Sequence, residues 1–169
     1  GDESSDATAG RAVAVPAAAA FERFARAKSA DASERLETRL RAATDRFDHV
    51  ICDVPPVGAN PHVAAVTTAD RRVAVAPGTD HGADARRRLA DRLADLDCTL
   101  DATLAVGDSI PAADATIPDG PPSVADAPAT LHDPRFAERV IAAAETTLGV
   151  TCDVTVERDG PLDRVRDAI

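Results

Sequence analysis

Short apolar segments that end near proline or glycine alternate with segments of helical periodicity, and this alternation limits the folds open to the chain. The clearest apolar run is Val50–Cys52, which is followed by Asp53 and two prolines; Arg72–Pro77 and Leu100–Val106 are the next candidate strands, and Arg11–Pro16 is a shorter one. A continuous apolar run such as Val50–Cys52 is typical of a strand that is covered on both faces in a parallel sheet.

Helical segments separate these runs. Asp31, with Glu34 three residues later, has the pattern of a helix start, and apolar residues follow it at helical spacing. Strands that alternate with helices of this length form βαβ units. We therefore expect a three-layer α/β fold, in which a mostly parallel sheet has helices on both faces. The expected helices are Ala17–Lys28, Asp31–Phe47, Asn60–Thr68, Ala83–Leu96 and Arg135–Leu148.

The remaining segments set the expected domain limits. Residues 1–9 are small and polar and are expected to be a flexible lead-in, and residues 10–149 form the α/β domain. Residues 150–169 are expected to hold a C-terminal edge strand, at 150–156, and a tail. Within the domain, residues 107–132 carry five prolines and little helical pattern, which predicts a long loop.

The charge balance is strongly acidic. The chain has 29 Asp and Glu residues against 19 Lys and Arg, a formal net charge of -10, and a single lysine, Lys28. Carboxylates keep a surface solvated when salt screens charge, so the composition favours a cytoplasmic protein of a salt-accumulating halophile over an ordinary acidic protein. The net charge argues against a general nucleic-acid binder, although it leaves room for a local basic patch.

The metal-binding residue types show no cluster in the sequence. Cys52, Cys98 and Cys152 are widely spaced, which favours free buried thiols over a zinc site. The four histidines are isolated from one another and are expected to be structural or exposed. We find no membrane-spanning run and no signal peptide.

A carboxylate directly after a buried strand is the strongest functional feature. Asp53 at the carboxyl end of a parallel strand would lie in the crevice where open α/β sheets bind ligands, although such an Asp is also a common turn residue or helix cap. The surrounding residues, Phe47 to Pro56, resemble the Walker B segment of the ParA/MinD family of deviant P-loop ATPases, in which an apolar strand ends in Asp-x-Pro-Pro.

The resemblance extends over about residues 11–149. Thr68-Ala69-Asp70 matches the family's Ala-Asp pair, and residues 72–78 and 104–106 match its next two core strands. Ile117-Pro118 matches the Ile-Pro that follows in the family.

This resemblance implies ATP hydrolysis with Mg²⁺. Asp53 would hold the magnesium ion, through a water molecule, because Mg²⁺ keeps several waters and uses few carboxylates. Pro55 and Pro56 would stiffen the switch segment after it. The 107–132 loop would wrap the adenine, with Pro118 against the base.

The chain departs from the family in two places. It has no glycine-rich phosphate-binding loop, and Lys28 lies in an Ala-rich context without glycines. In the family the strand of that loop lies beside the Walker B strand, so we expect it on a segment before Gly1; the absence of methionine agrees with a fragment or a processed chain. Asp108 stands where the family has an Asn that reads adenine, and a carboxylate offers no donor.

Two alternatives stay open for the function. The chain is either the C-terminal part of a ParA/MinD-like ATPase in DNA partitioning or intracellular positioning, as a homodimer, or a degenerate relative that acts through protein contacts. A metal-insertion or reductase-type relative is a weaker third. Arg86, Arg87 and Arg88 either contact DNA phosphates or form a solvated helix face, and the apolar stripe Leu162/Val165/Ile169 is too short and acidic to predict membrane targeting.

Overall fold

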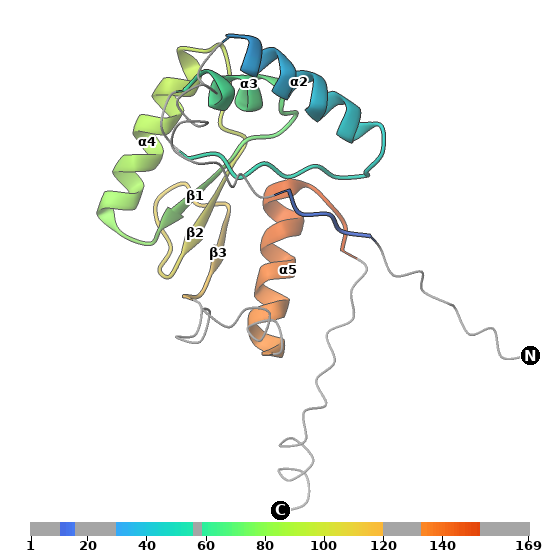
Figure 1. The fold of residues 1–169 in the computed structure, drawn as a ribbon. Helices are drawn as coiled ribbons and strands as arrows, with labels where there is room; N and C mark the ends of the chain where they lie inside the picture. The colour runs from blue at the N-terminus through green and yellow to red at the C-terminus, as the bar shows by residue number, and fades with distance from the viewer. Residues whose placement is uncertain (1–10, 16–29, 56–58, 120–132, 153–169) are drawn as a thin grey trace, which may run out of the picture.

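Three parallel strands form the sheet of the computed structural model, which describes residues 11–15, 30–55, 59–119 and 133–152 (Figure 1). The strands are β1 (Val73–Pro77), β2 (Ala102–Val106) and β3 (Ala115–Ile117), in the order β1-β2-β3. In register, Ala76 pairs with Ala105 and Leu104 pairs with Ala115. The chain is therefore an α/β domain with a parallel sheet. The helices are α2 (Ala30–Thr44), α3 (Asn60–Thr68), α4 (Asp80–Ala94) and α5 (Pro134–Leu148).

Helices α4 and α5 cover opposite faces of the sheet. Both faces of β2 are closed, because Ala102 is 3% exposed and its neighbour Thr103, which faces the other way, is 1% exposed. Arg86 on α4 donates from Nε to Thr103 Oγ1 at 2.9 Å, so α4 lies on the Thr103 face. Helix α5 contacts β2 and β3 and covers the opposite face, and Figure 1 shows the strands between the two helices.

Small side chains let α4 approach the sheet closely. Ala76 and Ala105 are buried with Ile110, and Ala83 of α4 packs against them. A Cβ at Gly82 would lie 2.0 Å from the carbonyl oxygen of Pro77, so only glycine permits this contact between α4 and the end of β1. Thr79 caps the start of α4, because its side chain accepts a hydrogen bond from the Gly82 amide at 3.1 Å.

Two arginine side chains hold the amino-terminal end of β1. Arg72 donates to the main-chain oxygens of Val66 and Ala69, which joins the end of α3 to the start of β1. Arg71 donates from Nε to the oxygen of Thr147 at 2.5 Å, which joins the start of β1 to the end of α5.

The prediction that Val50–Cys52 is a buried strand is wrong. These residues are not in a strand, and Val50 and Ile51 are 36% and 75% exposed. A strand must share its backbone hydrogen bonds with a neighbour, and no such neighbour is present in the described part of the chain. Arg11–Val15 forms no strand either, with Val15 88% exposed.

Several helix predictions are confirmed with changes in packing. Helix α3 has the predicted bounds, whereas α2 begins at Ala30, so that Asp31 lies in its first turn and does not precede it. Helix α2 packs against α3. Helix α4 spans Asp80–Ala94 in place of the expected Ala83–Leu96, so Leu96 lies beyond its end and is 38% exposed. The buried residues of α5 are Ala137, Ala143 and Thr147. The larger apolar residues on this helix, Phe136, Val140 and Leu148, are half-buried.

Other predictions have different outcomes. The 107–132 loop contains β3 in its described half, because the three residues of this strand complete the pairing of β2. The thiols are free, as predicted, but Cys52 is exposed and Cys98 and Cys152 are half-buried. Residues 150–152 are not in a strand. The predicted lead-in, the Ala17–Lys28 helix, residues 120–132 and residues 153–169 lie outside the described residues.

Candidate functional site

The loops that follow the three parallel strands meet at one edge of the sheet. The Gly78 amide donates to the Val106 oxygen at 2.7 Å, and the Gly107 amide donates to the Ile117 oxygen at 2.9 Å. The carboxyl edge of an open parallel sheet is where ligands bind in α/β proteins. Asp108 and Pro118 belong to these loops, and both are exposed.

Two glycines let the loops approach each other. A Cβ at Gly78 would lie 2.0 Å from the carbonyl oxygen of Asp108. Gly107 has a φ of +88°, and a Cβ there would lie 3.2 Å from the carboxylate oxygens of Asp119. Glycine therefore stands at position 78, where the backbone of the next loop leaves no room for a side chain, and at position 107, where φ is positive.

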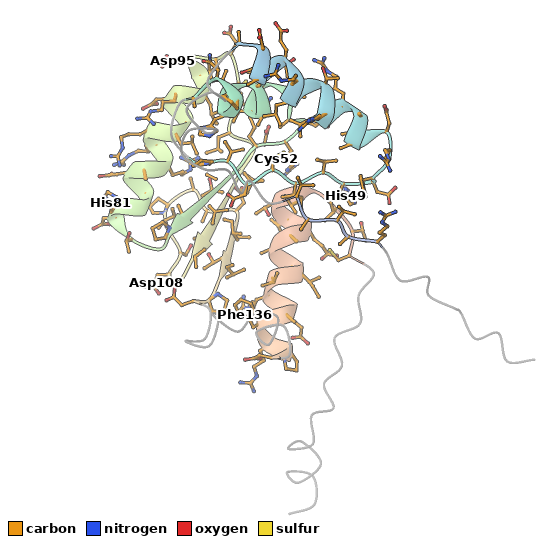
Figure 2. All side chains as sticks on the ribbon, viewed as in Figure 1. His49, Cys52, His81, Asp95, Asp108 and Phe136 are labelled. Carbon is orange, nitrogen blue, oxygen red and sulfur yellow. The ribbon has the colours of Figure 1, made fainter. Side chains whose placement is uncertain are left out.

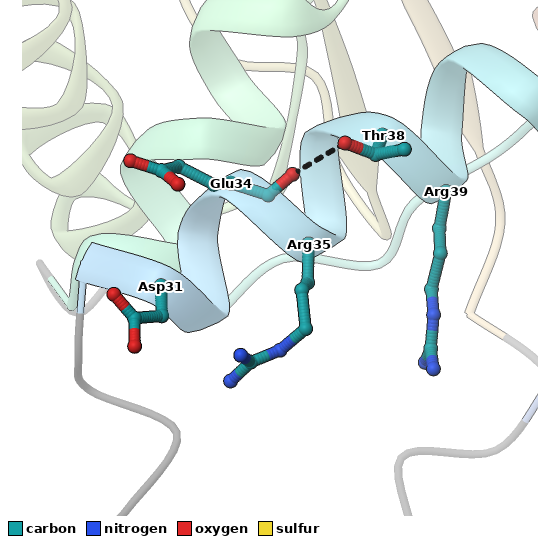
Figure 3. Close-up of a pocket in the computed structure, with 5 residues that line it drawn as sticks. All are labelled: Asp31, Glu34, Arg35, Thr38 and Arg39. Carbon is teal, nitrogen blue, oxygen red and sulfur yellow. Dashed lines mark hydrogen bonds between the residues drawn. The ribbon is translucent and has the colours of Figure 1, made fainter.

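One hollow, of about 450 Å³, is lined by residues of α2 alone (Figure 3). Its lining residues are Asp31, Glu34, Arg35, Thr38 and Arg39. Thr38 Oγ1 donates to the Glu34 oxygen at 2.9 Å, a bond within the helix. No second element encloses this surface in the described structure, so we do not assign it a ligand.

The edge hollow, of about 320 Å³, lies between the end of β3 and the start of α5. Its size is at the low end of the roughly 300–1,000 Å³ typical of small-molecule sites. Phe136 is half-buried in it, and Figure 2 places Phe136 and Asp108 toward the same end of the sheet. The lining residues are Pro118, Asp119, Asp133, Arg135, Phe136 and Arg139.

The start of α5 fixes one wall of the edge hollow. Asp133 Oδ1 accepts hydrogen bonds from the amides of Arg135, at 2.9 Å, and Phe136, at 3.3 Å, so it caps the helix. This cap sets the position from which Phe136 and the two arginines, Arg135 and Arg139, enter the hollow. The site thus offers an apolar ring, two guanidinium groups and two carboxylates.

Of the residues that the resemblance names, Pro118 lines this hollow, and the sequence did not single out the other lining residues. Phe136 belongs to the expected Arg135–Leu148 helix, and the Asp133-Pro134 pair before it is the sequence signal for a helix start. Which loops a helix start meets depends on the tertiary fold, so the sequence pattern alone does not identify these residues as part of a site.

Asp53 is not part of the edge hollow. It is exposed and lies on the extended segment after α2, as does Pro55, and Pro56 lies outside the described residues. Figure 2 shows Cys52, the residue before Asp53, well separated from Asp108. The described residues contain no group of three or more His, Cys, Asp and Glu side chains that could hold a metal ion.

The three consecutive arginines of α4 have different environments. Arg86 is half-buried against Thr103, so its guanidinium is used inside the domain. Arg87 is exposed and pairs with Asp84, and Arg88 is exposed. Of the three, only Arg87 and Arg88 present their side chains on the surface. Among the described residues, no helix has the length and apolar character needed to cross a membrane.

Searches against family models, curated proteins and solved structures find no match to this chain.

Proposed function

We propose that the chain is the C-terminal part of a ParA/MinD-like ATPase, with a P-loop NTPase-like fold, and that its edge hollow receives the adenine end of ATP. The observation that carries the proposal is the hollow itself, because it lies at the carboxyl edge of a parallel sheet. Pro118 and Phe136 supply apolar surface for a base, and the arginines beside them supply donors.

The residues present fit the base of a nucleotide better than its phosphates. A glycine-rich loop that would surround phosphates with backbone amides is absent from the sequence. In the proposed enzyme this loop comes from another polypeptide segment. Asp53 would then hold Mg²⁺ through water, and Pro55 and Pro56 would restrict the backbone after it. Bound Mg²⁺ would supply charge neutralisation at the phosphates.

Partners follow from the same proposal. A ParA/MinD-like ATPase would act as a homodimer in the cytoplasm, in DNA partitioning or intracellular positioning. Any contact with DNA would come from Arg87 and Arg88, because Arg86 is engaged with Thr103. Such contacts would weaken steeply with salt.

Calorimetric titration in molar KCl tests the proposal. We expect the 169-residue chain to bind adenosine and ATP with similar dissociation constants of about 1 mM, or roughly 4 kcal/mol, and without dependence on Mg²⁺. Phe136→Ala should remove this binding, whereas Phe47→Ala, which changes a half-buried Phe outside the hollow, should not. Micromolar, Mg²⁺-dependent binding of ATP by the chain alone would contradict the claim that the phosphate site is incomplete.

A second candidate function is protein interaction without nucleotide chemistry. Large apolar residues that are exposed favour this candidate. Ile51, in the Val50–Cys52 segment that forms no strand, is 75% exposed, and Val75 of β1 is 67% exposed. Absence of both adenosine and ATP binding in the titration would favour this candidate.

A further inference from the structure

The carboxylate of Asp119 lies between the end of β2 and the edge hollow. Asp119 follows β3 by two residues, and the oxygen of Ile117, the last residue of β3, accepts a hydrogen bond from the Gly107 amide at 2.9 Å. Pro118 stands between them and has a restricted φ. Both carboxylate oxygens of Asp119 lie 3.2 Å from the place that a Cβ on Gly107 would occupy. The side chain of Asp119 therefore folds back over a residue that has no side chain.

The charged groups of the edge hollow do not satisfy one another. Arg135 and Arg139 line the hollow with Asp119, yet no ion pair joins Asp119 to either arginine within the described residues. The second carboxylate of the lining is already in use, because Asp133 Oδ1 accepts the two amides at the start of α5. The Asp119 carboxylate is thus an acceptor without an internal partner, and it shares the hollow with guanidinium donors from α5.

The hydrogen-bonding groups of a purine base decide which side chain can meet each of its edges. The adenine base of a nucleotide has a single donor group, the exocyclic amine at position 6 of the ring, and its ring nitrogens are acceptors. A donor that leaves water needs an acceptor, because an unpaired polar group costs free energy. A guanidinium group only donates, whereas an ionised carboxylate only accepts. Among the lining side chains, Asp119 is therefore the group that can meet the amine.

From these observations we propose that Asp119 accepts a hydrogen bond from the exocyclic amine of adenine and makes the edge hollow selective for 6-aminopurines over 6-oxopurines. This inference rests on the proposed function, because it requires that the hollow receives a purine base. In a 6-oxopurine an oxygen replaces the amine, so two acceptors, one of them charged, would face each other. Pro118 and Phe136 offer apolar surface to either base and do not discriminate between them.

Three nucleosides that differ only at position 6 of the purine test the inference. Adenosine carries an amine there, purine riboside a hydrogen and inosine an oxygen, and none of the three is charged. Titration of the 169-residue chain in molar KCl, followed by NMR, measures dissociation constants in the millimolar range. We expect purine riboside to bind about three- to tenfold more weakly than adenosine, and inosine about tenfold more weakly or less tightly still.

A pair of isosteric variants shows whether Asp119 is the group responsible. The amide of Asp119→Asn can present either its oxygen or its NH₂ group, so this variant should bind the three nucleosides within about twofold of one another. The exposed side chain of Asp119 has no internal partner to lose, so the variant should fold. Asp95→Asn removes one charge outside the hollow and should keep the preference for adenosine. An unchanged preference in Asp119→Asn would overturn the proposal.

The same titrations separate failure of this inference from failure of the proposed function. If the three nucleosides bind equally well and Phe136→Ala removes their binding, the hollow receives a base but Asp119 does not select it. Inosine that binds as tightly as adenosine, or more tightly, would mean that its ring N–H or its oxygen meets the lining instead. Either result overturns the inference and leaves the proposed function in place. If no nucleoside binds, the proposed function is contradicted, and the inference is overturned with it.

Discussion

Gly78 and Asp108 pack backbone against backbone at the carboxyl edge of the sheet. A Cβ on Gly78 would lie 2.0 Å from the carbonyl oxygen and 2.3 Å from the amide nitrogen of Asp108. This approach, together with the 2.7 Å bond from the Gly78 amide to Val106, joins the loop after β1 to the loop after β2. The loop that contains Asp108 therefore has its position set by a residue with no side chain.

Gly78→Ala should destabilise the domain by about 1–3 kcal/mol, because backbone atoms must move to admit the added methyl group. Urea denaturation followed by circular dichroism measures the free energy of unfolding. Ser109→Ala, at an exposed position next to Asp108, is the control and should stay within about 0.5 kcal/mol of the unchanged chain. A Gly78→Ala variant as stable as this control would mean that the two loops are not in contact.

The elements that the sequence predicted well are those with a complete local signal. Helix α3 and strands β1 and β2 combine a continuous pattern with a clear start or stop, such as Pro61 at the start of α3 and Gly107 after β2. The parallel arrangement followed from the alternation of these elements. Each of these predictions depends on residues close together in the sequence, where propensity and side-chain spacing act directly.

The elements that were predicted wrongly depend on distant partners. Val50–Cys52 has the composition of a buried strand, but a strand also needs a neighbour with which to form hydrogen bonds. β3 has only three residues in a proline-rich region, and it is a strand because β2 offers it an edge. The edge hollow combines the end of β3 with the start of α5, so its lining could not be derived from either segment alone.

Removal of the helix cap at Asp133 should weaken both the fold and the hollow. Asp133→Ala leaves the amides of Arg135 and Phe136 without their acceptor, and we expect a loss of about 1 kcal/mol in the free energy of unfolding. Asp133→Asn keeps a side-chain oxygen at the same place, so it should lower the free energy of unfolding by only roughly 0.3 kcal/mol. Equal losses for the two variants would indicate that charge, and not capping geometry, stabilises this end of α5.

The consecutive arginines of α4 should respond differently to substitution. Arg86→Met removes the donor to the buried hydroxyl of Thr103 and should cost about 1–3 kcal/mol of stability. Arg88→Met changes an exposed side chain on the same helix and should stay within about 0.5 kcal/mol. Thermal unfolding of the two variants under identical salt conditions provides the comparison. If Arg88→Met cost as much as Arg86→Met, the inward position of Arg86 would be wrong.

Asp108→Asn should strengthen binding of adenine nucleotides if the proposed function is correct. The amide adds a hydrogen-bond donor where the carboxylate only accepts, and one such bond contributes about 0.5–1.5 kcal/mol, or roughly a three- to tenfold change in the dissociation constant. Asp95→Asn controls for the loss of one negative charge. Asp95 directly follows the last residue of α4 and lies far from Asp108 (Figure 2). Equal gains in affinity for both variants would show that the effect is a general reduction of repulsion, and would count against base recognition at Asp108.

Substitution of Ile51 tests whether Val50–Cys52 is the buried strand expected from the sequence or the exposed segment seen in the structure. If Ile51 were part of a buried strand, its substitution by alanine would lower the free energy of unfolding of the domain by about 2–5 kcal/mol. Because it is 75% exposed in this chain, we expect Ile51→Ala to change the free energy of unfolding by less than about 0.5 kcal/mol. Leu93→Ala, at a position that is 4% exposed, is the matched control and should show the full loss of a buried side chain. A large loss at Ile51 in the isolated chain would mean that Val50–Cys52 has a strand partner within these 169 residues. A loss that appears only after a segment with a phosphate-binding loop is joined to the chain would support the proposed ATPase, because the added strand would then bury Ile51.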